Sequence, residues 1–182
     1  MKAYNSFLSR KEVMNIGFAS IGDNVLISRN ASFYSANKIH IGNNVRIDDF
    51  CILSGKITIG SNIHISAYCA LYGAYGIELM DYSGMSPRSI IFSASDDFSG
   101  DSLIGPHIPK EFQKIIGGKV ILSKYCQLGA ASIVLPKCTI NEGSVTGAMT
   151  LVINDLEPWM IYSGSPAKAL KKRSKKLLEF IK

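Results

Sequence analysis

Apolar residues recur at every sixth position along most of this chain of 182 residues. The positions in this register are Ile21, Ile27 and Phe33, then, after a slip of two residues, Ile41, Ile47, Leu53, Ile59, Ile65, Leu71 and Ile77, and later Ile116, Leu122, Leu128, Val134, Ile140 and Val152, with Thr146 as an exception. A period of six fits neither the 3.6-residue turn of an α-helix nor the unbroken alternation of a long strand. It is typical of a short strand followed by a turn, repeated many times.

A second inward position follows each of these residues by four places. It is small or aliphatic, as at Val25, Ala31, Val45, Ile57, Ile63, Ser132 and Ser144. Glycine or asparagine often lies between the two, as in "IGNNV", and forms the corner. Three such units close one triangular coil of a parallel β-helix, and stacked coils share one continuous core. The pattern therefore predicts an all-β, parallel β-helix with coils over 21–77 and 116–157.

The two ends of the chain carry helix signals. Ser9 and Glu12 match a capping box, which predicts a short helix that stops near Gly17 within an amino-terminal cap over 1–20. Ser165 and Pro166 suit the first positions of a second helix. An apolar stripe follows at Leu170, Leu177, Leu178 and Ile181. We therefore expect a basic carboxyl-terminal α-helix over 165–182.

The register is lost between the two series, over residues 78–115. This excursion contains Asp96, Asp97, Asp101 and His107. Long irregular excursions from a rigid scaffold usually carry function, so the active site is predicted here. In "SIIFSASDDFSG" the adjacent aspartates have two interpretations. They carry chemistry, or they end a strand and begin a turn, because Ser, Asp and Gly dominate turns.

Charge and length narrow the class of protein. The length suits one domain. The net charge is +6, but seven basic residues and one acidic residue lie from Lys168 onward, so the rest of the chain is balanced. This basic end has no aromatic interleaving and no nucleic-acid motif, and we expect no nucleic-acid partner. No apolar run is long enough to span a bilayer and no secretory signal is recognisable, so a cytoplasmic protein is expected.

The cysteines and histidines give no sign of a metal or redox centre. All four cysteines (Cys51, Cys69, Cys126 and Cys138) fall in the small inward slot, which predicts reduced core residues. The three histidines, His40, His64 and His107, are separated by 24 and 43 positions. Zinc sites usually include two ligands close together in the sequence, which these histidines lack, so no metal is expected.

The repeat and the run that ends in the "G-x-P-A" turn, Gly164 to Ala167, resemble the left-handed β-helix, hexapeptide-repeat acyltransferases. The resemblance extends from about Ile21 to Arg173. It implies a left-handed coil, a homotrimer with sites between subunits, and acetyl-CoA or another short-chain acyl-CoA as donor. It also implies donor contacts at Gly129, Ala130, Gly147 and Ala148, with Lys168 and Arg173 as candidates for its phosphates.

The sugar O-acetyltransferases of this family place a catalytic histidine in a phrase similar to "T-A-T-H". Here the matching phrase is "SAS" followed by Asp96. A hydroxyl nucleophile needs a base such as imidazole, whereas a carboxylate of pKa about 4 is a weaker base. An amine can lose its proton to a modest acceptor. The phrase "SDDFSG" also resembles the subgroup that acylates nucleotide-linked amino sugars for surface polysaccharides. We therefore predict N-acylation of an amino sugar, with Asp96 and Asp97 as catalytic candidates.

Two other functions stay open. One is O-acetylation of a sugar hydroxyl, for which His107 would be the better base. The other is a β-helix scaffold without chemistry, in which the excursion is an interface loop. Arg88 and Glu111 border the excursion, and we expect them to contact substrate in an enzyme.

Overall fold

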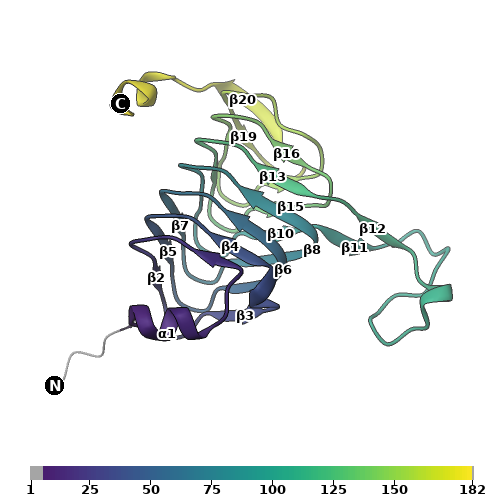
Figure 1. Ribbon diagram of the computed structural model, residues 1–182. Helices are drawn as coiled ribbons and strands as arrows, with labels where there is room; N and C mark the ends of the chain where they lie inside the picture. The colour runs from purple at the N-terminus through teal and green to yellow at the C-terminus, as the bar shows by residue number, and fades with distance from the viewer. Residues whose placement is uncertain (1–5, 182) are drawn as a thin grey trace.

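The computed structural model describes residues 6–181 of the chain. It is a column of triangular coils, whose strands lie on three faces that we call A, B and C (Figure 1). Face A contains β1 (Ser20–Ile21), β4 (Ile39–Ile41), the second halves of β6 (Ile52–Ile59) and β8 (Ala70–Leu79), β13 (Val120–Leu122) and β16 (Thr139–Ile140). Face B contains β2 (Leu26–Ile27), β5 (Val45–Ile47), β7 (Ile63–Ile65), β9 (Gly84–Met85), β14 (Gln127–Leu128), β17 (Val145–Thr146) and β19 (Met160–Ser163). Face C contains β3 (Ser32–Tyr34), the first halves of β6 and β8, β10 (Ile90–Phe92), β15 (Ile133–Val134) and β18 (Leu151–Val152).

The strand pairing confirms the predicted parallel β-helix. Strands from successive coils pair in parallel, with Leu53 opposite Leu71 and Ile47 opposite Ile65, so one coil is three six-residue units. These four side chains are fully buried and belong to a single apolar column that runs through the coils. Each coil thus buries its apolar side chains only because its neighbours cover them.

The four cysteines are buried and free, as predicted. Burial raises the pKa of the Cys126 thiol to about 12 and that of Cys138 to about 11. Thiols in this state are poor nucleophiles and poor metal ligands, because both roles need the thiolate. The cysteines therefore act as small core residues.

The excursion starts later than the sequence pattern predicts. Leu79, Met85 and Ile91 are fully buried and continue the six-residue register through β8, β9 and β10. An eight-residue step from Leu71 to Leu79, like that from Phe33 to Ile41, hides this fourth coil in the sequence. Conversely, Ile116 lies outside the coils and is 42% exposed. The predicted start of the excursion at 78 is thus wrong by most of a coil, whereas its predicted end at 115 lies close to the end of β12 (Ile115–Gly117).

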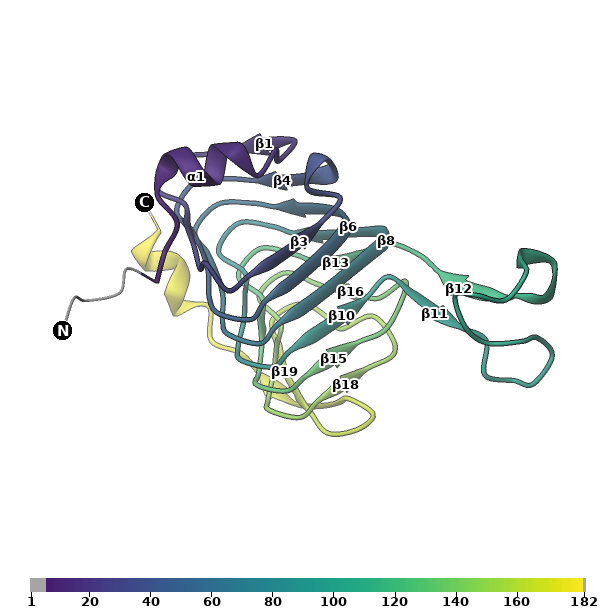
Figure 2. The same cartoon turned by 90° about the horizontal axis from the view of Figure 1, so that it is seen from below.

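The true excursion is an arm over residues 94–117. It consists of β11 (Ala94–Asp96), the 3₁₀ helix η2 (Lys110–Phe112) and β12 (Ile115–Gly117), which pairs with β11 in antiparallel orientation. The arm leaves the column at the corner between faces C and A, because β10 precedes it and β13 follows it. Figures 1 and 2 both show it projecting away from the coils.

The two ends of the column are covered differently from each other. The helix α1 (Arg10–Asn15) begins at Ser9 with the predicted capping box. A short 3₁₀ helix, η1 (Ala36–Lys38), follows the first coil. At the other end the predicted carboxyl-terminal α-helix is wrong. The chain instead forms β20 (Lys168–Lys172), antiparallel to β19, and a 3₁₀ helix, η3 (Lys176–Phe180). The open edge of face B needs backbone partners, and β20 supplies them where a helix could not.

No helix among residues 6–181 has the length and apolar character needed to cross a membrane.

Candidate active site

Asp96 lies at the base of the arm, where it faces the outer surface of the column. It is the last residue of β11 and pairs with Ile115 of β12. It lines a cavity of about 460 Å³ whose other walls are mostly apolar and come from the arm and from late coils. These walls are Phe92, Ala94, Ser95, Phe98, Ile133, Leu135 and Leu151. In the described part of the chain, no side-chain hydrogen bond or ion pair engages the Asp96 carboxylate, so it is available to a ligand.

A second cavity adjoins the first, with a volume of about 520 Å³. It shares Ser95, Asp96, Phe98 and Leu135 with the first and adds Asp97, Ser99, Ile116, Pro136 and Ile153. The half-buried Asp96 carboxylate therefore lies between two adjoining cavities whose walls are mostly apolar.

The neighbouring carboxylate, Asp97, is already engaged. Its Oδ2 lies 2.6 Å from the Lys114 Nζ, and its Oδ1 accepts a hydrogen bond of 3.0 Å from the Ser99 N–H. The Lys114 ammonium holds the pKa of Asp97 below its usual value. These contacts are those of a turn that begins the arm loop. The two interpretations of the aspartate pair thus divide between the residues: Asp97 builds the turn and Asp96 stays free.

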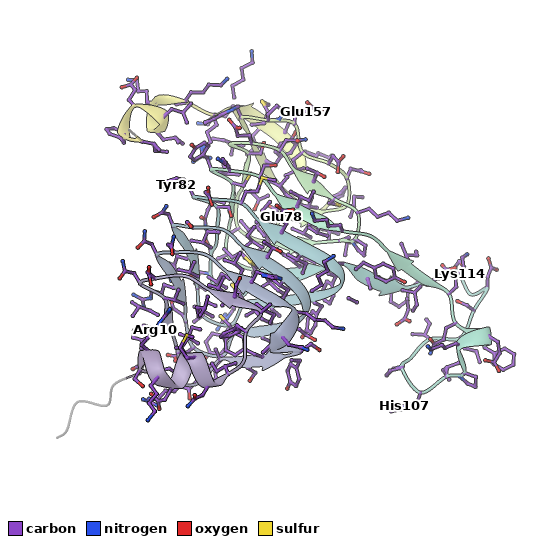
Figure 3. The ribbon with its side chains drawn as sticks, viewed as in Figure 1. Arg10, Glu78, Tyr82, His107, Lys114 and Glu157 are labelled. Atoms are coloured by element: carbon purple, nitrogen blue, oxygen red, sulfur yellow. The ribbon has the colours of Figure 1, made fainter. Side chains whose placement is uncertain are left out.

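His107 and Glu111 lie at the far end of the arm. Figure 3 shows His107 in the loop there, away from the coils, and its side chain is exposed. Glu111 is also exposed and borders a small cavity of the arm tip together with Asp101 and Lys114. Within one chain the structure therefore does not bring His107 together with Asp96.

The predicted donor contacts gather at the corner between faces B and C, which we call the B–C corner. Gly129 with Ala130, and Gly147 with Ala148, occupy equivalent turns of two successive coils. A Cβ at Gly129 would lie 2.4 Å from the Gly147 carbonyl carbon, so coil packing itself requires this glycine. The Ala130 and Ala148 N–H groups carry no hydrogen bond to any described residue and are open to an extended ligand.

The structure separates the two predicted phosphate contacts. Lys168 pairs with Ser163, at the end of face B beside the B–C corner, and is exposed. Arg173 instead donates from Nη1 to the carbonyls of Tyr125 and Gly143, at 2.6 and 2.8 Å. Those carbonyls belong to the opposite corner, between faces A and B. Burial lowers the pKa of Arg173, and its side chain anchors the end of the chain.

Ser86 is a corner residue that the sequence pattern did not single out. It follows Met85 at the B–C corner of the fourth coil and accepts a hydrogen bond of 3.1 Å from the Gln127 Nε2. Its place is one turn below Gly129, because the Ser86 N–H donates to the Leu128 carbonyl at 2.9 Å. The continued register through Met85 was the signal that could have located it.

Comparisons with known proteins find relatives over almost the whole chain. No family model matches the sequence. An Escherichia coli protein named dTDP-4-amino-4,6-dideoxy-D-glucose acyltransferase is 41% identical over 177 residues, which is 96% of this chain and 92% of that protein. A hexapeptide-repeat acetyltransferase from Vibrio cholerae, 16% identical with a TM-score of 0.59 over 91% of this chain and 80% of its own, shares the fold alone.

The solved structures of AntD, an N-acyltransferase from Bacillus cereus, are much more similar. One holds dTDP-4-amino-4,6-dideoxyglucose and coenzyme A; it is 51% identical with a TM-score of 0.97, over 98% of this chain and 96% of that one. Another holds dTDP and 3-hydroxybutyryl-CoA, at 52% identity and a TM-score of 0.96, over 98% of this chain and 95% of that one. Several AntD structures carry a substitution either at one serine or at an aspartate ten residues further along.

Proposed function

This chain belongs to the hexapeptide-repeat acyltransferases, in the subgroup that acts on sugars, and from that premise we propose that it moves an acyl group from coenzyme A to the amino group of a nucleotide-linked amino sugar. The favoured acceptor is dTDP-4-amino-4,6-dideoxyglucose, which AntD binds. The observation that carries the proposal is the unengaged carboxylate of Asp96, which lines an apolar cavity at the base of the arm.

The chemistry needs few protein groups. The Asp96 carboxylate holds the ammonium of the acceptor and takes its proton, which leaves a neutral amine. The amine nitrogen then attacks the thioester carbonyl carbon, forming a C–N bond and a tetrahedral intermediate. Collapse breaks the C–S bond, and the thiolate of coenzyme A leaves and takes up the proton released from the nitrogen. The apolar cavity favours the neutral amine over the ammonium, because desolvation disfavours the charged form.

The spacing of the residues substituted in AntD supports this assignment. Ser86 and Asp96 are the only serine and aspartate in this sequence with the aspartate ten residues after the serine. They lie at opposite ends of β10, which alone separates them by roughly 10 Å at about 3.3 Å per residue. A site that uses both is complete when Asp96 of one copy meets Ser86 of a neighbouring copy.

The outer surface of face C supports a homotrimer. One row of outward side chains consists of Ile52, Ala70, Ile90, Ile133 and Leu151, and the next row includes Tyr72, Phe92, Leu135 and Ile153. Tyr72 stacks on Phe92 with ring centroids 5.2 Å apart. This apolar surface lies between the B–C corner and the arm, and large apolar surfaces of this kind mark protein contacts. In the proposed trimer each face C is covered, and each arm reaches the B–C corner of a neighbour.

The donor fits the B–C corner beyond Ser86. We assign the pantetheine arm to the free N–H groups of Ala130 and Ala148, and a phosphate of coenzyme A to Lys168. The apolar residues beside Asp96 face the acyl chain in this arrangement. Glu111, at the arm tip, contacts the acceptor of the neighbouring copy in this arrangement. The described residues contain no group of three potential metal ligands. The reaction written above uses no metal ion.

The handedness of the coil, the pathway and the cellular compartment are part of the same proposal. We assign the coil the left-handed sense of the family and the enzyme to surface-polysaccharide synthesis in the cytoplasm. Four buried cysteines without a disulfide suit such a reducing compartment.

A thiol-release assay tests the function. Purified protein is incubated with acetyl-CoA, butyryl-CoA or 3-hydroxybutyryl-CoA, and with dTDP-4-amino-4,6-dideoxyglucose or the dTDP-sugar that carries a hydroxyl at the same carbon. The expected result is release of free thiol only with the amine. Equal release with the hydroxyl acceptor would favour O-acylation, and no release with any pair would favour the scaffold.

A further inference from the structure

Two exposed aromatic residues and an arginine stack along the early part of the B–C corner. Phe50, Tyr68 and Arg88 occupy the same turn position in the second, third and fourth coils. The Phe50 and Tyr68 rings lie 5.0 Å apart with an interplanar angle of 23°, and the residues are 51% and 53% exposed. The Arg88 guanidinium carbon lies 5.9 Å from the centroid of the Tyr68 ring. We call this set the aromatic ladder.

The backbone conformation of this turn does not require these side chains. Phe50, Tyr68 and Arg88 have φ values of 58°, 62° and 64°. This left-handed conformation favours asparagine or glycine and is strained for bulky residues. The corner between faces A and B uses Asn24, Asn44 and Asn62 for the same turn in the first three coils, and Tyr82, Tyr125 and Trp159 in later ones, where the rings stack on one another. The aromatic ladder therefore accepts backbone strain that a simpler residue would avoid, and something other than the turn must account for it.

Packing within the chain does not account for the ladder either. At the corner between faces A and B, the later aromatic residues Tyr125 and Trp159 meet the end of the chain. Arg173 bonds the Tyr125 carbonyl, and the Lys175 ammonium lies 5.2 Å from the Trp159 ring. No such segment covers Phe50 and Tyr68 in the described chain. Their rings are presented to solvent, at a corner where the proposed active site continues.

The order of residues along the B–C corner matches the order of groups in the acceptor. Coils are about 4.8 Å apart, so Phe50 and Arg88 are roughly 10 Å apart along the column. From early to late coils the corner presents two aromatic rings, then the coil that holds both Arg88 and Ser86, and then the small residues assigned to pantetheine. A nucleotide-linked sugar presents a planar base, a diphosphate and an amino sugar in that order, and the amine must meet the thioester.

We propose that the aromatic ladder binds the nucleoside diphosphate of the acceptor, with Phe50 and Tyr68 contacting the base and Arg88 the diphosphate. This inference rests on the proposed function, since it gives the acceptor its orientation. Aromatic rings stack on any base, and the guanidinium donates paired hydrogen bonds to phosphate oxygens. The ladder thus directs the amino sugar toward Ser86 and the Asp96 of the neighbouring copy, while coenzyme A enters from the opposite end of the corner.

Direct binding tests the ladder without any turnover. Isothermal titration of the full-length protein with dTDP is compared for wild type, Phe50→Ala, Tyr68→Ala and Arg88→Ala. Loss of one stacking partner weakens base binding by roughly 5- to 150-fold in other proteins, and we expect an increase in Kd of that size for Tyr68→Ala. Arg88→Ala is expected to raise the Kd for dTDP at least about tenfold. The binding of thymidine, which has no phosphate and binds more weakly, is expected to stay unchanged.

The matched control is Tyr82→Ala, at the corner between faces A and B. Tyr82 is 44% exposed and stacks on Tyr125 with centroids 5.6 Å apart. This variant therefore removes a similarly exposed ring, but at a corner where no nucleotide is proposed to bind. We expect wild-type binding of dTDP by this variant. Tyr68→Phe is expected to keep dTDP binding, and all variants are expected to bind coenzyme A as wild type does.

Three results would overturn the ladder. The first is wild-type dTDP affinity in a folded Tyr68→Ala variant, as judged by circular dichroism. The second is an equal loss in Tyr82→Ala. The third is a change of oligomeric state in Tyr68→Ala that accounts for its weaker binding, which would make the rings a subunit contact. If the wild-type protein binds dTDP but releases no thiol with any acceptor, the proposed function fails while these binding results still decide the ladder.

Discussion

The column and the arm differ in whether their apolar side chains are buried. In the column each inward side chain of the repeat is covered by the coils above and below, and residues such as Leu71 and Ile91 are fully buried. In the arm the apolar side chains face outward: Phe98 is 74% exposed, and Phe112 is 55% exposed. The column therefore supplies the stability of the molecule. The arm holds the Asp96 carboxylate and exposes apolar side chains, which a neighbouring copy covers in the proposed trimer.

The apolar surface of face C links the two regions, so a charge placed on it has the largest expected effect. Leu151→Lys would bury an unpaired ammonium in each subunit contact, which costs several kcal/mol per charge. We expect monomers by light scattering and complete loss of thiol release, because the proposed site combines groups from two copies. The control is Leu26→Lys on the outer surface of face B, where Leu26 is 46% exposed. A trimeric, active Leu151→Lys variant would refute the proposed assembly.

A substitution at Asp96 is expected to lower the reaction rate without lowering the stability of the fold. Removing a proton acceptor at the reacting group typically costs about 100- to 10,000-fold in rate, so Asp96→Asn is expected to lower kcat/KM by that range with an unchanged melting temperature. Full kcat/KM in this variant would remove Asp96 from the mechanism. His107→Ala serves as the comparison, because the exposed His107 side chain lines neither of the cavities that Asp96 borders, and we expect its kcat/KM to stay within about threefold of wild type.

Leu71 shows the reverse behaviour. Leu71→Ala deletes a fully buried side chain of the column, and we expect the free energy of unfolding to fall by about 2 to 5 kcal/mol. Urea unfolding at fixed protein concentration measures this. Leu103→Ala in the arm, where Leu103 is 56% exposed, is expected to change stability by less than about 0.5 kcal/mol. Similar losses in both variants would mean that the arm folds as part of the column.

Arg173 tests whether the end of the chain belongs to the column or to the donor site. Arg173→Met leaves the Tyr125 and Gly143 carbonyls without this donor, and a lost hydrogen bond to a charged group costs about 1.5 to 3 kcal/mol. We expect that loss of stability together with unchanged binding of coenzyme A. The exposed neighbour Lys172→Met is the control. Weaker coenzyme A binding at unchanged stability would restore the phosphate role predicted for Arg173.

The smallest expected effect is an acid-dependent loosening of the arm. The pKa of Asp97 in the folded chain lies below its ordinary value of 3.8. Its contribution to stability is therefore complete above that value and is lost as the pH falls through the lower, folded pKa. We expect limited proteolysis of the arm to increase at acid pH while the column stays resistant. Asp97→Asn should show this susceptibility already at neutral pH, and an arm that resists proteolysis in that variant would contradict the prediction.

The column could be predicted from the sequence because its contacts repeat. A residue such as Leu53 meets its equivalent one coil later, so a periodic pattern along the chain reports a contact in space. The prediction was wrong where the period slipped, at Leu79, and where an edge had to be closed, at β20. Neither a slip nor an edge leaves a periodic trace.

The candidate site could be predicted only in part. Asp96 stood out because it lies in the phrase in which the family places its catalytic histidine. The side chains around it could not be assigned, since Ile133 and Leu151 come from later coils that reach the arm only in the folded chain. His107 was a candidate base only because imidazole suits that role. The length of the arm places His107 away from Asp96 within one chain.

The reversed direction of β20 has a consequence for how such a protein can change in length. A parallel coil offers its last edge as a template for another identical coil, and also for the first coil of a second molecule. An antiparallel strand ends that series at face B, and α1 occupies the opposite end. A further identical coil therefore cannot follow directly at face B, because the last strand there runs in the opposite direction to the strands of the coils.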